Sequence, residues 1–179
     1  KNNKPFKFAF FENILKSDFY RKLHDDYPDK LDDWQQSTQF SKNTLFRGWG
    51  GLDESGLSEG NEAVQDTKLS PEWNKFYRFL SSNEFIEKLR EFSGMPVNKL
   101  KSFRFGLMKK GGFQLPHTHN DGPSTIIIFF YFSNHSNNGI YNIGFYITNR
   151  FSNTSIKIYL FSMSPKRTKY FKWCTIFFS

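Results

Sequence analysis

The hydrophobic pattern changes its period once along this chain of 179 residues, and that change limits the folds that the chain can adopt. Between residues 70 and 94 the apolar side chains recur at intervals of three and four, which is typical of helices with one buried face. From residue 103 onward they recur at every second position, which is typical of a half-buried strand. Helices followed by strands predict an α+β fold whose core is built from strands.

Three helices are expected before these strands. Ser17 is expected to cap the first helix, which Pro28 ends, and Ser70 is expected to cap the second. Gly94 and Pro96 are expected to end the third. The predicted apolar faces consist of Phe19, Leu23 and Tyr27, then Trp73, Phe76, Tyr77 and Leu80, and then Phe85, Ile86, Leu89 and Phe92.

The remaining segments are predicted as strands and one long loop. Residues 5–11 form a short apolar strand, and residues 126–132 (IIIFFYF) are a continuous apolar run, suited to a strand buried on both faces. Residues 29–66 are polar, and Gly-rich from 48 to 60, so we expect a long loop there that could serve as a lid. A further strand is expected next. Its apolar face would carry Phe113, Leu115, His117, His119 and Asp121.

Composition limits the class of protein. Aromatic residues make up 20% of the chain, including 23 Phe, which favours a β-rich core. The single cysteine, Cys174, excludes a disulfide framework and fits a reducing, cytoplasmic compartment. No apolar run has the length of a membrane helix, and no signal-peptide pattern is visible, so no membrane partner is expected.

The net charge of +8 is unevenly distributed along the sequence. Residues 1–121 hold 19 basic and 17 acidic residues and are almost balanced. Residues 122–179 hold six basic residues and no acidic one. Because the basicity belongs to this tail, it argues against a nucleic-acid partner for the protein as a whole, although a basic patch for phosphates stays an alternative.

The stretch PHTHNDGPST, residues 116–125, contains the candidate chemistry. His119 and Asp121 are one residue apart, so on a strand they share a face and can bind one divalent ion. The alternative is a solvated turn, because residues 120–123 are all turn formers. Their position before an apolar strand favours a ligand site at the mouth of a barrel. A hydrolase of the His-x-His type is rejected, since the residues that follow His119 are too few for its large barrel.

The stretch SFRFGLMKKGGFQLPHTHNDGPSTIIIFFYFS (102–133) resembles the iron-ligating core of the Fe(II)- and 2-oxoglutarate-dependent dioxygenases, of the prolyl 4-hydroxylase-like kind. Residues 6–29 and 69–94 resemble the opening strand and the helices of that family, so the similarity covers roughly residues 4–133. It implies a double-stranded β-helix (jelly-roll) core with N-terminal covering helices. We expect a single domain over 1–179, well matched over 1–133 and atypical over 134–179.

The resemblance implies a site of two histidines and one carboxylate that leaves iron positions for 2-oxoglutarate and O2. His119 and Asp121 match the first two ligands. A register that uses His117 and His119 is the alternative; otherwise His117 lines the cleft. The implied reaction couples oxidative decarboxylation of 2-oxoglutarate to hydroxylation of a peptide or small molecule, with ascorbate as an optional reductant.

The second histidine of such a site is not found, because His135 follows too soon after Asp121 and lies in a Ser/Asn-rich turn. One hypothesis is a frameshift near residues 133–138, and another is truncation before that histidine and before the basic residue that would hold 2-oxoglutarate. A fragment or impaired copy is therefore expected. A non-catalytic binding module on the same jelly roll is the competing function. The sequence predicts neither the substrate nor the oligomeric state.

Overall fold

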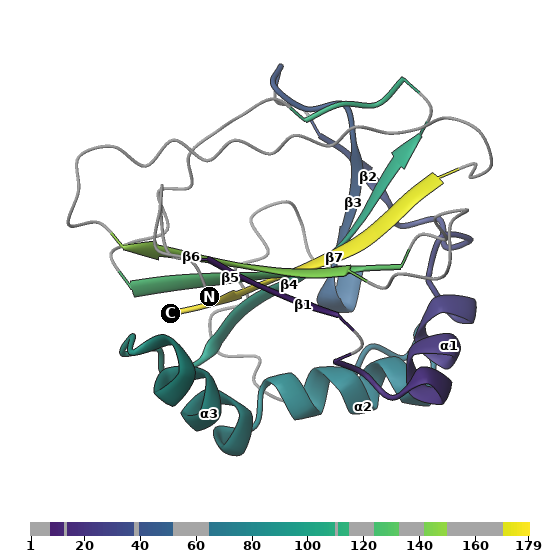
Figure 1. Ribbon diagram of the computed structural model, residues 1–179. Coiled ribbons are helices and arrows are strands. Elements are labelled where there is room, and N and C mark those ends of the chain that lie inside the picture. Colours follow the sequence, from purple (N-terminus) through teal and green to yellow (C-terminus); the bar gives the residue numbers. More distant parts are fainter. Residues whose placement is uncertain are drawn as a thin grey trace.

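The structure, a computed structural model, describes residues 8–12, 14–37, 40–51, 65–109, 111–114, 124–132, 142–149 and 170–179. In these ranges the chain forms three α-helices, one short 3-10 helix and seven strands. Figure 1 shows the three helices together on one side of the sheet that the strands form. The α+β class expected from the sequence is therefore confirmed.

Within the described ranges the strands form one open antiparallel sheet, in the order β1-β6-β5-β7-β4-β3-β2. Because β1 and β2 lie at opposite edges, this sheet does not close into a barrel, and a second, facing sheet is not among the described residues. The described fold is thus a layer of helices on one open sheet, and the expected jelly roll stays a prediction. The strands are β1 Phe8–Glu12, β2 Gln35–Gln36, β3 Leu45–Gly48, β4 Leu100–Lys109, β5 Ser124–Tyr131, β6 Asn142–Asn149 and β7 Tyr170–Phe178.

The first helix, α1 (Ser17–Asp25), begins one residue earlier than expected. Lys16 occupies the capping position, with extended backbone angles (φ −57°, ψ 136°) and no side-chain cap. Ser17 already lies in the first turn, so the prediction that it caps the helix is wrong. Tyr27 lies beyond the end of α1 and is buried all the same.

The helix α2 (Pro71–Leu80) begins, and the helix α3 (Asn83–Ser93) ends, where the sequence predicted. The Ser70 hydroxyl accepts a hydrogen bond from the Trp73 amide, and Gly94 ends α3 in the left-handed conformation (φ 71°) that glycine adopts without strain. On α3, Phe92 was expected on the buried face but is 36% exposed and lies beside the ring of Phe11. None of the three described helices combines the length and hydropathy that crossing a bilayer requires.

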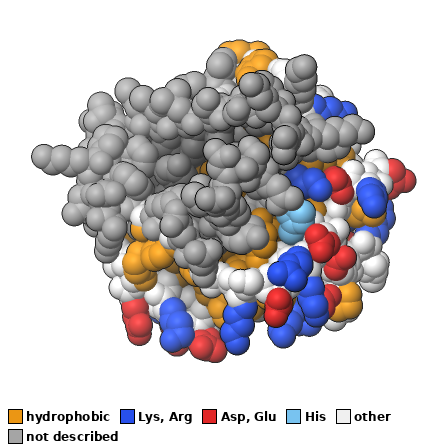
Figure 2. Space-filling view, turned by 45° about the vertical axis from the view of Figure 1, so that its right-hand side comes forward, with side chains coloured by type: hydrophobic (Ala, Val, Ile, Leu, Met, Phe, Trp, Pro, Cys, Tyr) orange, Lys and Arg blue, Asp and Glu red, His pale blue; other side chains and the backbone are white. Residues whose placement is uncertain are grey.

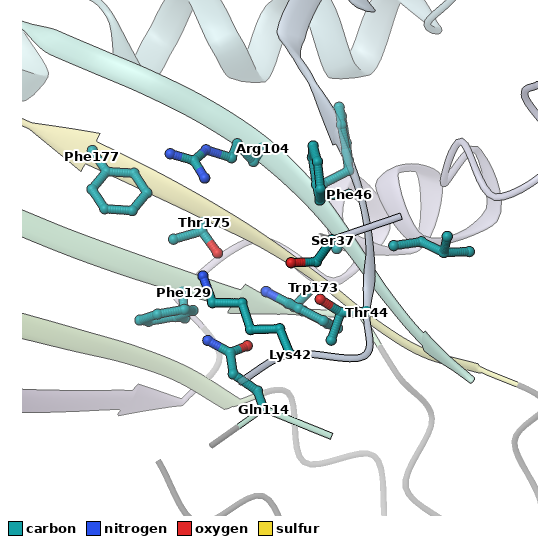
Figure 3. Close-up of a pocket in the computed structure, with 13 residues that line it drawn as sticks. Ser37, Lys42, Thr44, Phe46, Arg104, Gln114, Phe129, Trp173, Thr175 and Phe177 are labelled. Carbon is teal, nitrogen blue, oxygen red and sulfur yellow. The ribbon is translucent and has the colours of Figure 1, made fainter. Parts of the chain in front are cut away.

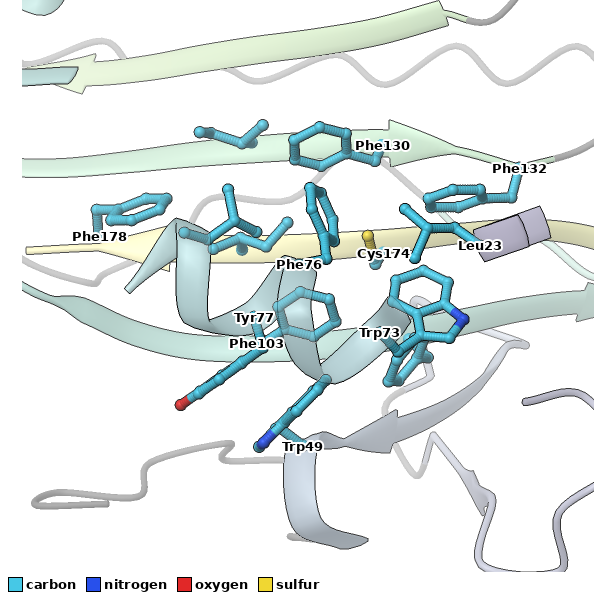
Figure 4. Packing of buried hydrophobic residues seen from close by; sticks show 14 of the residues in the cluster. Leu23, Trp49, Trp73, Phe76, Tyr77, Phe103, Phe130, Phe132, Cys174 and Phe178 are labelled. Carbon is cyan, nitrogen blue, oxygen red and sulfur yellow. The ribbon is translucent and has the colours of Figure 1, made fainter. Parts of the chain in front are cut away.

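Aromatic side chains of α2 form the centre of the core against the sheet (Figure 4). The ring of Trp73 meets Phe105 of β4 edge to face, with centroids 4.8 Å apart. Phe76 makes the same kind of contact with Phe130 of β5 at 5.1 Å. Such pairs add about 0.5–1.5 kcal/mol to the free energy gained by burial alone. The predicted apolar face of α2 is therefore confirmed as the surface that attaches the helix layer to the sheet.

The sheet is apolar on both faces. On the helix side, β4 contributes Phe103, Phe105 and Leu107 to the main core, as predicted. On the opposite side Met108 is also buried, so the expectation of a half-buried strand is wrong at this position. The continuous run of β5 is confirmed as buried on both faces. The cluster on the side away from the helices consists of Met108, Ile127, Phe129, Phe171, Trp173 and Phe177.

Residues 29–66, expected to be one long loop, contain secondary structure that their polar composition did not predict. They include β2, β3 and the 3-10 helix Trp49–Gly51, whose Trp49 ring stacks on Tyr77 at 4.1 Å. Arg47 of β3 is only 1% exposed, and its guanidinium donates to Asp33 at 2.7 Å and to Asp66 at 2.6 Å. A buried arginine gives no hydrophobic signal, so the sequence pattern missed this strand. Residues 52–64, the rest of the predicted lid, lie outside the described ranges.

The atypical tail supplies two strands of the sheet. β6 pairs with β5, and β7 is hydrogen-bonded to both β4 and β5. Cys174 pairs with Phe105 on one side and with Phe130 on the other, and it is fully buried. The unusual composition of the tail therefore does not keep it out of the core. A change of reading frame near residues 133–138 stays a prediction about the coding DNA.

Tyr27 connects the segment after α1 to the centre of the sheet. Its hydroxyl lies 2.8 Å from the Gly106 carbonyl oxygen and 2.6 Å from that of Trp173, and it accepts from the Gly106 amide at 3.1 Å. Burial is the main reason why the pKa of this phenol is raised. We expect Tyr27→Phe to lower the free energy of unfolding by about 1–3 kcal/mol, because buried backbone groups lose their partner.

Urea denaturation measures this loss. Tyr20→Phe is the matched control, since the Tyr20 hydroxyl is part-buried and donates to the Tyr131 carbonyl at a longer 3.2 Å. An equal or larger loss in Tyr20→Phe would contradict the central position given to Tyr27.

Asp33 makes stability depend on pH. Burial raises the pKa of its carboxyl, but hydrogen bonds from Arg47 and Lys68 lower it by more, so the net pKa lies below the ordinary value. Such a group stabilises the fold above its unfolded-state pKa and loses that contribution as the pH falls through its folded-state pKa. We expect the free energy of unfolding to fall below about pH 4, and Asp33→Asn to weaken that fall. Asp32→Asn, at a carboxyl 96% exposed, is the control; the same pH dependence in both variants would contradict the assignment.

Candidate functional site

The predicted metal ligands His119 and Asp121 lie outside the described residues, and so do His117 and His135. Within the described ranges no group of three or more His, Cys, Asp or Glu side chains is placed to hold a metal ion. The iron site therefore stays a prediction. The structure does describe the residues that lead up to the histidine stretch, residues 116–125.

The chain leads toward that stretch through a turn after β4. Gly111 has a φ of 81°, and the Gly112 amide donates to the Lys109 carbonyl at 2.8 Å. A Cβ on Gly112 would lie 2.6 Å from the Met108 side chain and 2.8 Å from the Asn43 carbonyl oxygen. Both glycines are thus required by the turn.

Two contacts attach the chain after the turn to the segment between β2 and β3. The Asn43 amide donates to the Phe113 carbonyl at 2.8 Å, and Lys42 forms an antiparallel bridge with Gln114. Phe113 itself is 42% exposed, so the prediction that it faces the apolar side is wrong. Gln114, the last described residue before the histidine stretch, lines a pocket.

This pocket opens on the sheet between β3, β4 and β7 (Figure 3). Its empty space amounts to about 530 Å³, part of it continuous with solvent. Among the described residues its polar lining comprises Ser37, Lys42, Thr44, Arg104, Gln114 and Thr175, and its aromatic lining includes Phe46, Phe129, Trp173 and Phe177. Figure 3 shows Arg104 and Thr175 on the strands and Lys42 and Gln114 coming from the segments beside them.

Strand register explains why these side chains meet. Gly48 of β3 pairs with Arg104, Arg104 pairs with Thr175 of β7, and Thr175 pairs with Phe129 of β5. Directly paired residues of an antiparallel sheet point to the same face. Phe129 belongs to the apolar cluster on the side away from the helices, as do Trp173 and Phe177, the alternate residues on either side of Thr175 in β7. Arg104 and Thr175 are therefore a polar pair set into an apolar sheet face.

The guanidinium of Arg104 is held by an aromatic ring. Its central carbon lies 5.2 Å from the centroid of the Phe177 ring, within the range of a cation–π contact. Phe177 pairs with Ser102, one alternate position along β4, so both side chains extend from the same sheet face. This contact restricts where the positive charge can lie in the pocket.

Gly106 leaves room for the indole ring of Trp173 in the lining of the pocket. It pairs with Trp173, and a Cβ at position 106 would lie 2.2 Å from Cε2 of the indole. Only a residue without a side chain leaves room for the ring in this position. Gly106 and Trp173 lie next to Arg104 and Thr175 on the same face of β4 and β7, and they fit closely against each other.

The charge of the described lining is positive. Lys42 and Arg104 supply two cations, and no acidic side chain is among the described residues that line the pocket. Hydroxyl and amide groups add further hydrogen-bond donors. Such a donor set fits a carboxylate, and it supplies no iron ligand. Lys109, at the end of β4, is exposed and does not line this pocket.

Cys174 contributes structure and no visible chemistry. It is fully buried on the helix side of β7, opposite to the pocket. Burial raises the pKa of its thiol well above the ordinary value, so the reactive thiolate is suppressed.

The described part of the face in Figure 2 carries charges of both signs. Figure 2 shows blue and red side chains interspersed over the described part of one face, around uncharged and apolar patches. Lys22 and Glu72 form one such mixed pair at 3.2 Å. A groove for a phosphate backbone would need an unmixed basic surface.

A scan against models of known protein families found no match, and no curated protein matches the chain significantly.

The sequence interpretation missed most of the pocket. It gave Arg104 no role, and it treated the tail as atypical. The alternation of Trp173, Thr175 and Phe177 with buried Cys174, Ile176 and Phe178 could have predicted a central strand. Lys42 and Gln114 reach the pocket through pairing of short segments that leave no sequence signal.

We expect Gly106→Ala to displace the Trp173 ring and to lower the free energy of unfolding by about 1–3 kcal/mol. The fluorescence of the indole should change at the same time, because its surroundings open. Denaturation of the single and double variants measures the coupling: in a Trp173→Ala background the cost of Gly106→Ala should largely vanish. An equal cost in both backgrounds would show that the ring is not the obstacle.

Proposed function

We propose that this chain is an Fe(II)- and 2-oxoglutarate-dependent dioxygenase, or an impaired copy of one, acting on a peptide or small molecule in a cytoplasmic setting. The observation that carries the proposal is the position of Gln114. The stretch with the expected ligands His119 and Asp121 begins at Pro116, two residues after Gln114, which lines a pocket with two cationic side chains. An iron site near that pocket would lie beside a site that can hold an acidic co-substrate.

The strand directions support a double-stranded β-helix as the finer fold. β4 and β5 both run antiparallel to β7 and hence parallel to each other. Lys109 at the end of β4 pairs with Tyr170, while the start of β5 lies near Phe178, at the other end of β7. A connection between these points has to cross the length of the sheet. A strand in a facing sheet, as jelly rolls have, would make that crossing.

The pocket is the part of the proposed chemistry that described residues can carry. When bound beside iron, 2-oxoglutarate supplies the two electrons that O2 activation needs. Lys42, Arg104 and the hydroxyl of Thr175 are groups that bind and orient a carboxylate. The aromatic side chains Trp173 and Phe177 exclude water from the carbon chain of such a ligand.

A non-catalytic binding module is the second candidate. The observation in its favour is that the pocket is lined by described residues and requires no metal, whereas a third iron ligand is not found in the sequence. On this proposal the chain binds a small acid on the same scaffold without turning it over.

Iron binding separates the two candidates. We expect Fe(II), added anaerobically, to quench tryptophan fluorescence weakly, and His119→Ala and Asp121→Ala to abolish the quenching. His135→Ala should leave it unchanged, because His135 is not expected to reach the ion. Loss in His117→Ala together with His119→Ala, and retention in Asp121→Ala, would select the alternative register.

Turnover is the direct test. With Fe(II) and ascorbate, we expect little or no release of succinate from 2-oxoglutarate, since at most two of three protein ligands are found. Robust release would show that the third ligand is supplied elsewhere. Quenching by Fe(II) that survives loss of both His119 and Asp121 would overturn the dioxygenase proposal in favour of the binding module.

A further inference from the structure

Two exposed phenylalanines lie on neighbouring segments of the described chain. Phe40, in the connection between β2 and β3, is 93% exposed, the largest value among the exposed large hydrophobic side chains of the described residues. Phe113, after the turn that follows β4, is 42% exposed. Neither ring lines the pocket. A single exposed apolar side chain needs no explanation, but two on adjoining segments form an apolar surface of the kind that marks a site of interaction.

Backbone hydrogen bonds fix these two segments against each other. The Ser37 amide donates to the Thr44 carbonyl at 3.0 Å, which closes the base of the β2–β3 connection. The Asn43 amide donates to the Phe113 carbonyl at 2.8 Å. Figure 1 shows the β2–β3 connection and the segment after β4 together at the upper edge of the molecule. Because their bases are held in place, binding through these segments costs little additional ordering of the backbone.

The sequence around both phenylalanines is free of negative charge. No Asp or Glu occurs from residue 34 to residue 52, or from residue 92 to residue 120. The turn that leads to Phe113 has the sequence KKGG (109–112), and Lys109 is exposed. Exposed aromatic rings beside an exposed lysine complement a surface that is negatively charged outside and apolar beneath.

A membrane with anionic lipids has both of these properties. Its headgroups attract lysine, and its acyl layer accepts aromatic side chains at a shallow depth. The exposure of Phe40 means that almost nothing surrounds its ring. A folded protein partner would have to supply a complete pocket for such a ring, whereas fluid lipid closes around it without a preformed cavity. The exposed rings and the absence of acidic residues therefore favour a lipid surface as the partner.

We propose that Phe40 and Phe113 insert into the surface of an anionic membrane, with Lys109 at the level of the headgroups. This contact is peripheral and requires no membrane-spanning helix. It goes beyond the proposed function, since it needs neither iron nor 2-oxoglutarate. The bridge between Lys42 and Gln114 connects this surface to the pocket, so the docked chain holds its pocket close to the lipid.

Cosedimentation of the full chain with lipid vesicles tests the proposal. We expect binding to vesicles made of phosphatidylcholine and phosphatidylserine in equal parts, and weaker binding as salt is raised. Vesicles of phosphatidylcholine alone should bind much less. Phe40→Ser should weaken binding roughly tenfold to a hundredfold, because an exposed ring no longer leaves water. Phe113→Ser should act in the same direction by a smaller factor, and Lys109→Gln should weaken binding about fivefold.

Matched controls come from the helix layer. Phe79→Ser removes a ring that is 49% exposed on α2, and Lys88→Gln removes an exposed charge on α3. Both should leave vesicle binding unchanged. Urea denaturation should give nearly the same midpoint for Phe40→Ser as for the unaltered chain, since its ring has little contact to lose. Should Phe113→Ser fail to fold, Phe40→Ser and Lys109→Gln still decide the matter.

Several results would overturn the proposal. These are no binding to anionic vesicles, equal binding to neutral vesicles, full binding by Phe40→Ser, or an equal loss in Phe79→Ser. Binding of a single-stranded oligonucleotide that is lost in Phe40→Ser, without vesicle binding, would assign the surface to nucleic acid instead. The metal site is tested independently: His119→Ala should bind vesicles as the unaltered chain does, even if Fe(II) no longer quenches its fluorescence.

Discussion

The double pairing of β7 holds the described structure together. This strand is bonded to β4 along one edge and to β5 along the other, so it joins a three-stranded part of the sheet that ends in β2 to one that ends in β1. The core beneath α2 draws residues from all three central strands. The pocket on the other face needs Trp173 and Thr175 of the same strand. Both layers of the molecule therefore depend on residues far along the chain.

A sheet that buries both faces sets demands on its sequence. Alternate residues cannot divide simply into apolar and polar, because each side meets another layer or a cluster of its own. The continuous run of β5 meets this demand with Ile and Phe at every position from 126 to 130, whereas β4 and β7 place Arg104 and Thr175 among apolar neighbours. In such a setting a polar pair stands out as the feature that packing alone does not explain.

Elements that form locally could be predicted from the sequence. The N-cap and apolar face of α2, the glycine that ends α3 and the buried run of β5 depend on neighbouring residues, and the structure confirms them. β3 could not be predicted in this way, since its stability comes from Arg47 meeting carboxylates of distant segments. The pocket combines residues from four separate segments, so no local pattern indicates it. The histidine stretch could be named as a candidate metal site, but its third protein ligand could not be identified.

Tyr27 gives the sheet a further property. Its hydroxyl bonds the backbone of Gly106 and Trp173 from the helix side, while the side chain of Trp173 lines the pocket on the other side. The two layers are thus coupled through the thickness of a single sheet. A ligand that moved the indole would pull on the peptide groups that hold the phenol, and the end of α1 would move with them. The helix layer would therefore respond to a shift of the Trp173 peptide group.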